Sequence, residues 1–184
     1  MLSKTIKPPK FLHDIHGRST TIFDIILTYT GGLLSVASVY ILCLQNSIDI
    51  SVWKLILLLL ISADIGAGVI ANFTKGTNSF YGGVRKKKSR LVFILSHFLH
   101  PAIFLYILDL ISVKTIGLVL FVIVTTFIID SIKNKENQRV FASFCLVSGI
   151  GITLYLKILD PLLLWFFPLY MTKLFIAFGI RRFE

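Results

Sequence analysis

Three ionisable side chains lie inside apolar stretches of the sequence, where they are suited to act on a ligand. His97 and His100 form an H-x-x-H pair, and a helix places such a pair on one face, one turn apart. Asp64 lies in the middle of another apolar run. A carboxylate in a membrane span costs at least ~2.5 kcal/mol to insert, so it indicates a function or a buried partner. Asp64, His97 and His100 are therefore the candidate catalytic residues.

The same three side chains are also suited to bind a divalent metal such as zinc. Two imidazole nitrogens and a carboxylate make a three-ligand site, whose open position would hold a water with a lowered pKa. Because H-x-x-H is a short pattern, a second interpretation stays open, in which Asp64, His97 and His100 only hydrogen-bond and hold helices together. His13 and His16 form another H-x-x-H near the N-terminus, where a solvated amphipathic segment is favoured over a metal site.

The composition excludes an ordinary soluble domain. Of the 184 residues, 55% are hydrophobic and 13% are aromatic, and whole segments are apolar on every side. The net charge of +10 comes from basic residues that lie between the apolar runs. This pattern is typical of a protein that contacts the lipid bilayer and anionic headgroups. No nucleic-acid-binding motif is visible, so we expect no nucleic-acid partner.

The apolar runs predict an all-α, polytopic integral membrane protein with six transmembrane helices. Residues 1–21 form a basic interfacial leader, in which Pro8-Pro9 blocks an early helix, and residues 22–184 form the transmembrane domain. Each run has the ~20 residues that a crossing helix needs. The predicted spans cover residues 22–45, 51–73, 91–112, 115–132, 140–156 and 162–180. The last span contains Pro168, where we expect a kink.

The distribution of Lys and Arg predicts the orientation. Most of them lie in the leader, the tail, and the connections that follow the second and fourth spans. The opposite side carries only Lys54, Lys114 and Lys157, while Lys173 lies within the last span. The positive-inside rule therefore puts both termini in the cytoplasm, and an even number of spans agrees. We expect a multi-pass protein of the cell membrane.

Polar side chains from four spans reach the cytoplasmic half of the predicted bundle. At a helix rise of 1.5 Å per residue, Asp64 and His100 lie roughly 15 Å deep and His97 lies roughly 10 Å deep. We therefore predict one polar cavity, open to the cytoplasm and formed by Asp24, Asp64, Asn72, His97, His100 and Asp130.

The connection after the second span supplies candidate ligand-binding residues. Asn72 and Thr74, at its start, are expected to cap the helix or to line the cavity. Loop 76–83 is a mobile lid or, as the pattern favours, a flexible turn. The basic run that follows anchors the chain to anionic headgroups and is suited to attract an anionic substrate, such as a lipid phosphate. The candidate substrate-binding residues are Asn72, Thr74, Asn78, Tyr81, Arg85 and Arg90.

Small and polar residues form two helix-packing seams in the first two spans. Such rows let helix backbones approach closely, within one chain or between copies in a homo-oligomer. The rows are Asp24, Thr28, Gly31, Ser35 and Ser38 in the first span and Ala63, Ala67 and Ala71 in the second.

The leading hypothesis for function is a membrane-embedded enzyme that acts on a lipid or amphiphile from the cytoplasmic leaflet. The sequence alone leaves open whether the protein is an enzyme. A lone membrane carboxylate such as Asp64 also suits a small oligomeric proton-coupled transporter. A third hypothesis is a non-catalytic membrane partner or assembly factor, whose polar residues only hold helices together.

Overall fold

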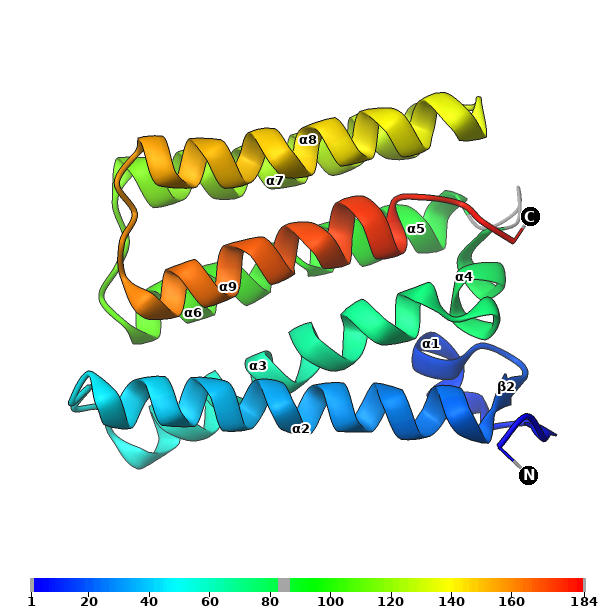
Figure 1. The fold of residues 1–184 in the computed structure, drawn as a ribbon, viewed down its shortest axis with the longest axis horizontal. Coiled ribbons are helices and arrows are strands. Elements are labelled where there is room, and N and C mark those ends of the chain that lie inside the picture. The colour runs from blue at the N-terminus through cyan, green and yellow to red at the C-terminus, as the bar shows by residue number, and fades with distance from the viewer. Residues whose placement is uncertain (1, 83–86, 184) are drawn as a thin grey trace.

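Six long helices dominate the computed structural model, which describes residues 2–82 and 87–183 (Figure 1). They are α2 (Ile22–Gln45), α3 (Val52–Phe73), α5 with α6 (Lys87–Ser96 and Leu99–Ile107), α7 (Val113–Ser131), α8 (Lys135–Tyr155), and α9 (Pro161–Met171) with its π-helical continuation η3 (Thr172–Phe178). Each is long and apolar enough to cross a membrane. The prediction of an all-α protein with six such helices is confirmed, and the chain is a multi-pass membrane protein.

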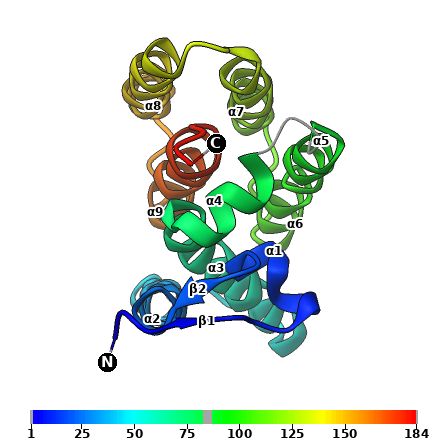
Figure 2. The same cartoon turned by 90° about the vertical axis from the view of Figure 1, so that its right-hand side faces the viewer.

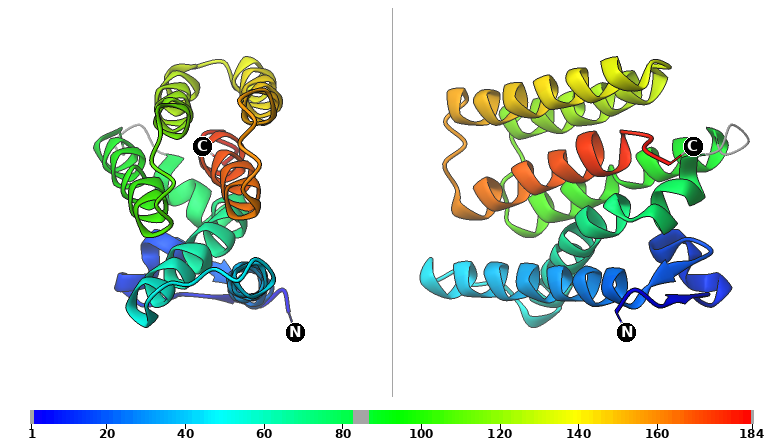
Figure 3. Two further views of the ribbon diagram at one scale, coloured as in Figure 1. Left: turned by 90° about the vertical axis from the view of Figure 1, so that its left-hand side faces the viewer. Right: turned by 45° about the vertical axis from the view of Figure 1, so that its right-hand side comes forward.

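The long helices run side by side, with α7 and α8 at one edge, α2 at the opposite edge, and α9 and α6 between them (Figures 1 and 3). Both chain termini lie at the same end of the bundle, as an even number of spans requires. The connection from α7 to α8 also lies at this end. Its cytoplasmic location remains a prediction from the Lys and Arg distribution.

The last helix lies at the centre of the bundle. Within its apolar window 61% of the residues are buried, against 22% for α2. Phe166 on this helix stacks on Phe104 of α6, with ring centroids 4.3 Å apart, and both rings are fully buried. Helix α9 continues through Pro168 and changes to π-helical geometry at Thr172. Groups on this helix are therefore held by contacts from several neighbours.

Two helices begin about one turn before the predicted spans. Helix α5 begins at Lys87 rather than at residue 91, and α8 begins at Lys135 rather than at residue 140. The Asn134 side chain accepts the Asn137 N–H at 2.9 Å, and this N-cap starts α8 in the segment predicted to be a basic connector.

The predicted small-residue seams pack α2 against α3. A Cβ added to Gly66 would lie 1.8 Å from Ser35 Oγ, and one added to Gly32 would lie 3.3 Å from the Ala67 Cβ. Backbones this close require small side chains on both helices. The seam prediction is confirmed for Gly31, Ser35, Ala63 and Ala67, whereas Ser38 is exposed, and the homo-oligomer remains a prediction.

The N-terminal segment folds across one end of the bundle (Figure 2). Strand β1 (Thr5–Ile6) pairs antiparallel with β2 (Thr20–Thr21). Along the chain, the two strands are connected by η1 (Lys10–Leu12) and α1 (His13–His16). Helix α1 packs against α4 (Lys75–Gly82). The prediction of a solvated segment is wrong for His16, which is 1% exposed. The prediction of a loop is wrong for the residues that form α4.

A close backbone approach joins this leader to α4. Gly17 has φ +69°, and a Cβ added there would lie 2.0 Å from the Gly76 carbonyl oxygen. The Thr77 hydroxyl donates to the Ile15 carbonyl, and the Thr77 N–H donates to the Thr74 hydroxyl at 3.3 Å. The start of α4 is thus held both by its own cap and by the leader.

Candidate functional site

Asp64 on α3 receives two nitrogen donors from other helices. Lys173 Nζ donates to Asp64 Oδ2 at 2.5 Å and to the Asp64 main-chain oxygen at 3.1 Å. His100 Nε2 lies 2.8 Å from the same Oδ2 atom. The Lys173 side chain is 2% exposed, whereas the Asp64 side chain is 51% exposed. The ion pair is therefore buried at the ammonium and open at the carboxylate.

Lys173 was not among the residues predicted to form the site. The sequence did contain an indication of its role, because a lysine within an apolar span needs a partner such as a carboxylate. Gly68, one helical turn after Asp64, makes room for it, since a Cβ there would lie 2.4 Å from Lys173 Cε. Lys173 also lies near the start of η3, and π-helical turns are frequent at functional sites.

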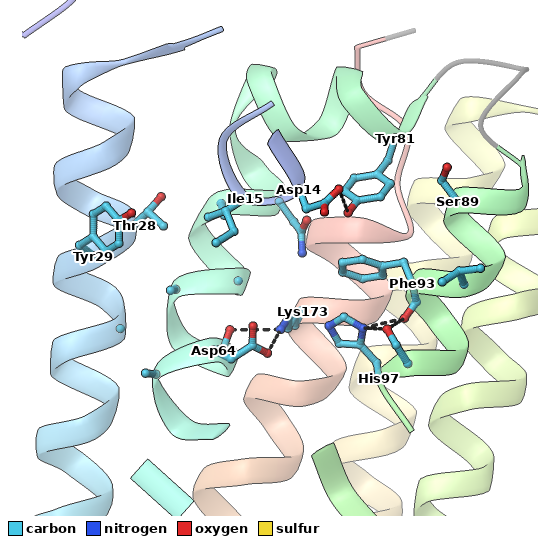
Figure 4. Close-up of a pocket in the computed structure, with 18 of the residues that line it drawn as sticks. Asp14, Ile15, Thr28, Tyr29, Asp64, Tyr81, Ser89, Phe93, His97 and Lys173 are labelled. Atoms are coloured by element: carbon cyan, nitrogen blue, oxygen red, sulfur yellow. Dashed lines mark hydrogen bonds and ion pairs between the residues drawn. The ribbon is translucent and has the colours of Figure 1, made fainter. Parts of the chain in front are cut away.

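His97 has one occupied ring nitrogen and one without a partner. Its Nδ1 lies 2.7 Å from the Phe93 carbonyl, which can only accept, so Nδ1 carries a proton. In the neutral ring, Nε2 is then an acceptor, and this buried atom has no hydrogen-bond partner. The ring stacks between Phe93 and His100, with centroid distances of 3.9 Å and 4.7 Å. In Figure 4 it lies between the Phe93 carbonyl and the Asp64–Lys173 pair.

A helix break fixes the backbone of His97. Pro101 has no N–H to donate to the His97 carbonyl four residues earlier. The hydroxyl of Tyr170, a fully buried residue on α9, donates to that carbonyl at 2.8 Å instead. This contact ties the junction of α5 and α6 to the central helix. The sequence contained Pro101, but the break was not predicted.

Asp64, His97 and His100 meet as predicted. Each offers one ligand atom, these atoms lie within 4.8 Å of one another, and no other group of three metal-ligating side chains was found among residues 2–82 and 87–183. Two features favour acid–base use over a metal. A metal bound by both imidazoles must lie near the plane of each ring, which their stacking does not provide unless a ring rotates. The ammonium of Lys173 would also repel a dication.

Asp64, His97 and Lys173 form the floor of a pocket of about 990 Å³ between α2, α3 and α5, whereas His100 does not line it (Figure 4). The lining is mostly apolar. Residues on the walls include Leu33, Val36, Ala67 and Val92. The leader contributes Asp14 and Ile15 to the lining. The half-exposed Asp64 side chain indicates that the pocket is open rather than sealed. The arrangement can therefore receive a molecule with an apolar body and a polar end.

No protein-family model, no curated protein and no solved structure matches this chain. The site combines a carboxylate, an ammonium and two imidazoles beside an apolar-walled pocket.

The candidate substrate-binding residues divide into three groups. Asn72 and Tyr81 line the pocket. Thr74 and Asn78 make structural contacts: Thr74 caps α4, and the Asn78 amide donates to the Ile180 carbonyl at 3.0 Å and accepts the Arg182 N–H at 2.9 Å. Arg85 lies outside the described residues.

Arg90 is buried away from the pocket. Its Nε donates to Asp130 Oδ1 at 2.6 Å, and its Nη2 donates to the Phe178 carbonyl at 3.1 Å. The guanidinium lies 4.3 Å from the centroid of the Phe178 ring, and the residue is 3% exposed. Asp24 forms a capping box with Thr21 at the start of α2. The predicted shared cavity is therefore wrong for Asp24, His100 and Asp130, which do not line the pocket.

Two groups of the leader region have shifted pKa values. Burial raises the pKa of Tyr81, and so does the Asp14 carboxylate, whose Oδ1 accepts the Tyr81 hydroxyl at 3.3 Å. Tyr81 therefore remains a donor at neutral pH. Burial lowers the pKa of His16, and the negative charge of Asp24 partly offsets this effect. His16 is thus stabilised as a neutral ring, next to the Tyr29 hydroxyl at 3.3 Å.

Proposed function

We propose that the protein is a membrane-embedded enzyme that acts on an amphiphile by acid–base chemistry. The observation that carries this proposal is the unpartnered Nε2 of His97 beside an ion pair at an apolar-walled pocket. Buried polar atoms in native proteins usually have partners, and an exception calls for an explanation such as a catalytic role. The end of the bundle that carries both termini would face the cytoplasm.

His97 is the proposed general base. Its Nε2 takes a proton from the polar end of the ligand, so that an O–H bond breaks, an N–H bond forms, and the electron pair stays on oxygen. Nδ1–H remains bonded to the Phe93 carbonyl, which keeps the ring oriented. The carboxylate of Asp64 stabilises the imidazolium. General base catalysis of this kind contributes about 10²–10⁴-fold to a rate.

Lipid conversion in nanodiscs tests the proposal. The purified protein is reconstituted with a total lipid extract of the host membrane, and the lipids are followed over time by mass spectrometry. We expect at least one amphiphile to be consumed with the appearance of a product. Unchanged lipids with the wild-type protein would overturn the proposal.

A pair of matched variants assigns the conversion to the site. His97→Phe keeps an aromatic ring between Phe93 and His100 but removes the base. His13→Phe makes the same change outside the pocket, where His13 packs edge-on against Phe80. Conversion should be lost in His97→Phe and retained in His13→Phe. Equal conversion by both variants would exclude His97 as the base.

The proton-coupled transporter is the second candidate function. The feature that favours it is the ion pair itself, because Asp64 and Lys173 join α3 to a π-helical segment of the central helix. Protonation of Asp64 would release this contact. Proton-driven uptake of a solute into liposomes, lost in Asp64→Asn and without lipid conversion, would favour transport over catalysis.

A further inference from the structure

The unpartnered ring nitrogen of the pocket belongs to His97 and is an acceptor when this imidazole is neutral. His97 Nδ1 is committed as a donor to Phe93, which leaves Nε2 as a lone pair. The neighbouring His100, whose Nε2 lies 2.8 Å from Asp64 Oδ2, does not line the pocket. A lone pair binds an O–H or N–H group and repels the oxygens of a phosphate or carboxylate. The site therefore favours a ligand that carries a hydrogen-bond donor.

The charges of the site point to the same kind of ligand. The Lys173 ammonium donates twice to Asp64, so its charge is already paired. The other cation in the described lining is Lys88, which lies nine residues before His97 along the chain of α5 and thus roughly 13 Å away. An anionic group beside His97 would lose its hydration without gaining a free cation, which is unfavourable.

We infer that the pocket binds a neutral hydroxylated amphiphile of the long-chain alcohol class, an inference that rests on the proposed function. Its hydroxyl donates to His97 Nε2 beside Asp64 and Lys173, and its chain lies along Leu33 and Val92 on the pocket walls. The pocket, at about 990 Å³, has the size of small-molecule sites. The hydroxyl that His97 deprotonates is then part of the amphiphile itself. The pocket does not have to bind a phosphate group for this step.

Competition among three probes with one chain tests this inference. Hexadecanol, hexadecyl methyl ether and hexadecyl phosphate compete with a photoreactive hexadecanol for the full chain in nanodiscs, and the labelled peptides are identified by mass spectrometry. The label should map to α2, α3 and α5. We expect the ether to bind about threefold to tenfold more weakly than hexadecanol, as expected for the loss of one hydrogen bond. The phosphate should also compete more weakly.

The variants separate failure of the inference from failure of the proposed function. In His97→Phe the alcohol and the ether should bind equally, while His13→Phe should keep the wild-type difference. Equal binding of ether and alcohol to the wild-type protein, or tighter binding of the phosphate, would overturn the inference and leave an amphiphile pocket in place. Absence of pocket labelling by the photoreactive hexadecanol would also overturn the inference, whereas the proposed function is overturned by unchanged lipids with the wild-type protein.

Discussion

Arg90 with Asp130 and Lys173 with Asp64 are two ion pairs between helices, and their surroundings differ. Both cations are buried, but Asp130 is 20% exposed and Asp64 is 51% exposed. Arg90 also binds two main-chain carbonyls and the Phe178 ring, and lies away from the pocket. The Lys173 pair faces the pocket and adjoins two imidazole nitrogens without partners. A satisfied network stabilises a fold, whereas an incomplete one leaves atoms for a ligand.

Breaking the first pair should have the largest effect on stability. Asp130→Ala leaves the guanidinium of Arg90 buried without its carboxylate, so we expect a loss of about 3–5 kcal/mol. Thermal and denaturant unfolding in detergent measure this loss. Lipid conversion per folded molecule should stay unchanged, because neither residue lines the pocket. Replacing both partners by apolar residues, Arg90→Met with Asp130→Leu, should recover most of the stability, and failure to do so would contradict the pair's structural role.

The second pair should show the opposite balance. Asp64→Asn removes the charge that Lys173 and His100 contact, but it keeps a side-chain oxygen that can accept a hydrogen bond from the Lys173 ammonium. We expect a smaller stability loss of about 1.5–3 kcal/mol, the range for hydrogen bonds to charged groups, together with loss of lipid conversion. Unfolding and lipid mass spectrometry on one preparation measure both. Lowered stability with unchanged conversion would show that Asp64 holds the helices together and takes no part in catalysis.

The contact between Tyr170 and the His97 carbonyl tests how the open site is positioned. Tyr170→Phe leaves a buried carbonyl without a donor, which costs about 1–3 kcal/mol. Pro101→Ala restores the N–H that a regular helix would offer to that carbonyl. The double variant should therefore be more stable than Tyr170→Phe alone. Both variants should convert less lipid than the wild-type protein, because the junction of α5 and α6 changes. Additive stability losses in the double variant would contradict this coupling.

The helices were predictable because their signal is local, whereas partner choice is not. Apolar run length predicted six helices, and small-residue spacing predicted the α2–α3 seam. Depth along each span predicted that Asp64, His97 and His100 lie close together, because the residue count along a helix gives depth in the membrane but no lateral position. Depth also suggested a place in the cavity for Asp130, which lies elsewhere because lateral position depends on packing.

Lys173 and the leader show why the rest could not be predicted. Lys173 was counted only as a charge within a span, since its partner lies 109 residues earlier in the chain. The order of the leader depends on contacts with α4, such as the approach of Gly17 to Gly76. Neither contact leaves a periodic pattern in the sequence. Both became visible only when distant segments were placed side by side.

Gly17→Ala should loosen the leader while leaving both ion pairs intact. The backbone at Gly17 has positive φ, and a Cβ would collide with the Gly76 carbonyl. We expect faster proteolysis and faster hydrogen exchange within residues 5–21, with little change in global unfolding. Gly117→Ala is the matched control, because a Cβ added at Gly117 meets nothing within 4 Å. Equal protection of the leader in both variants would show that this approach is not required.

The smallest expected effect is a pH dependence of leader docking through His16. Burial lowers the pKa of His16 in the docked leader, while the undocked ring has the ordinary value of ~6.5. Below that pH the undocked leader takes up a proton that the docked one resists, so docking is strongest above pH ~6.5 and weakens as the pH falls, by at most about 1.4 kcal/mol per unit. Hydrogen exchange of residues 5–21 at several pH values measures this trend, and His16→Asn should flatten it. Because Arg90 and Asp130 lie outside this region, their helices should keep their protection over the same range, and a parallel loss there would mean that the pH acts on the whole bundle.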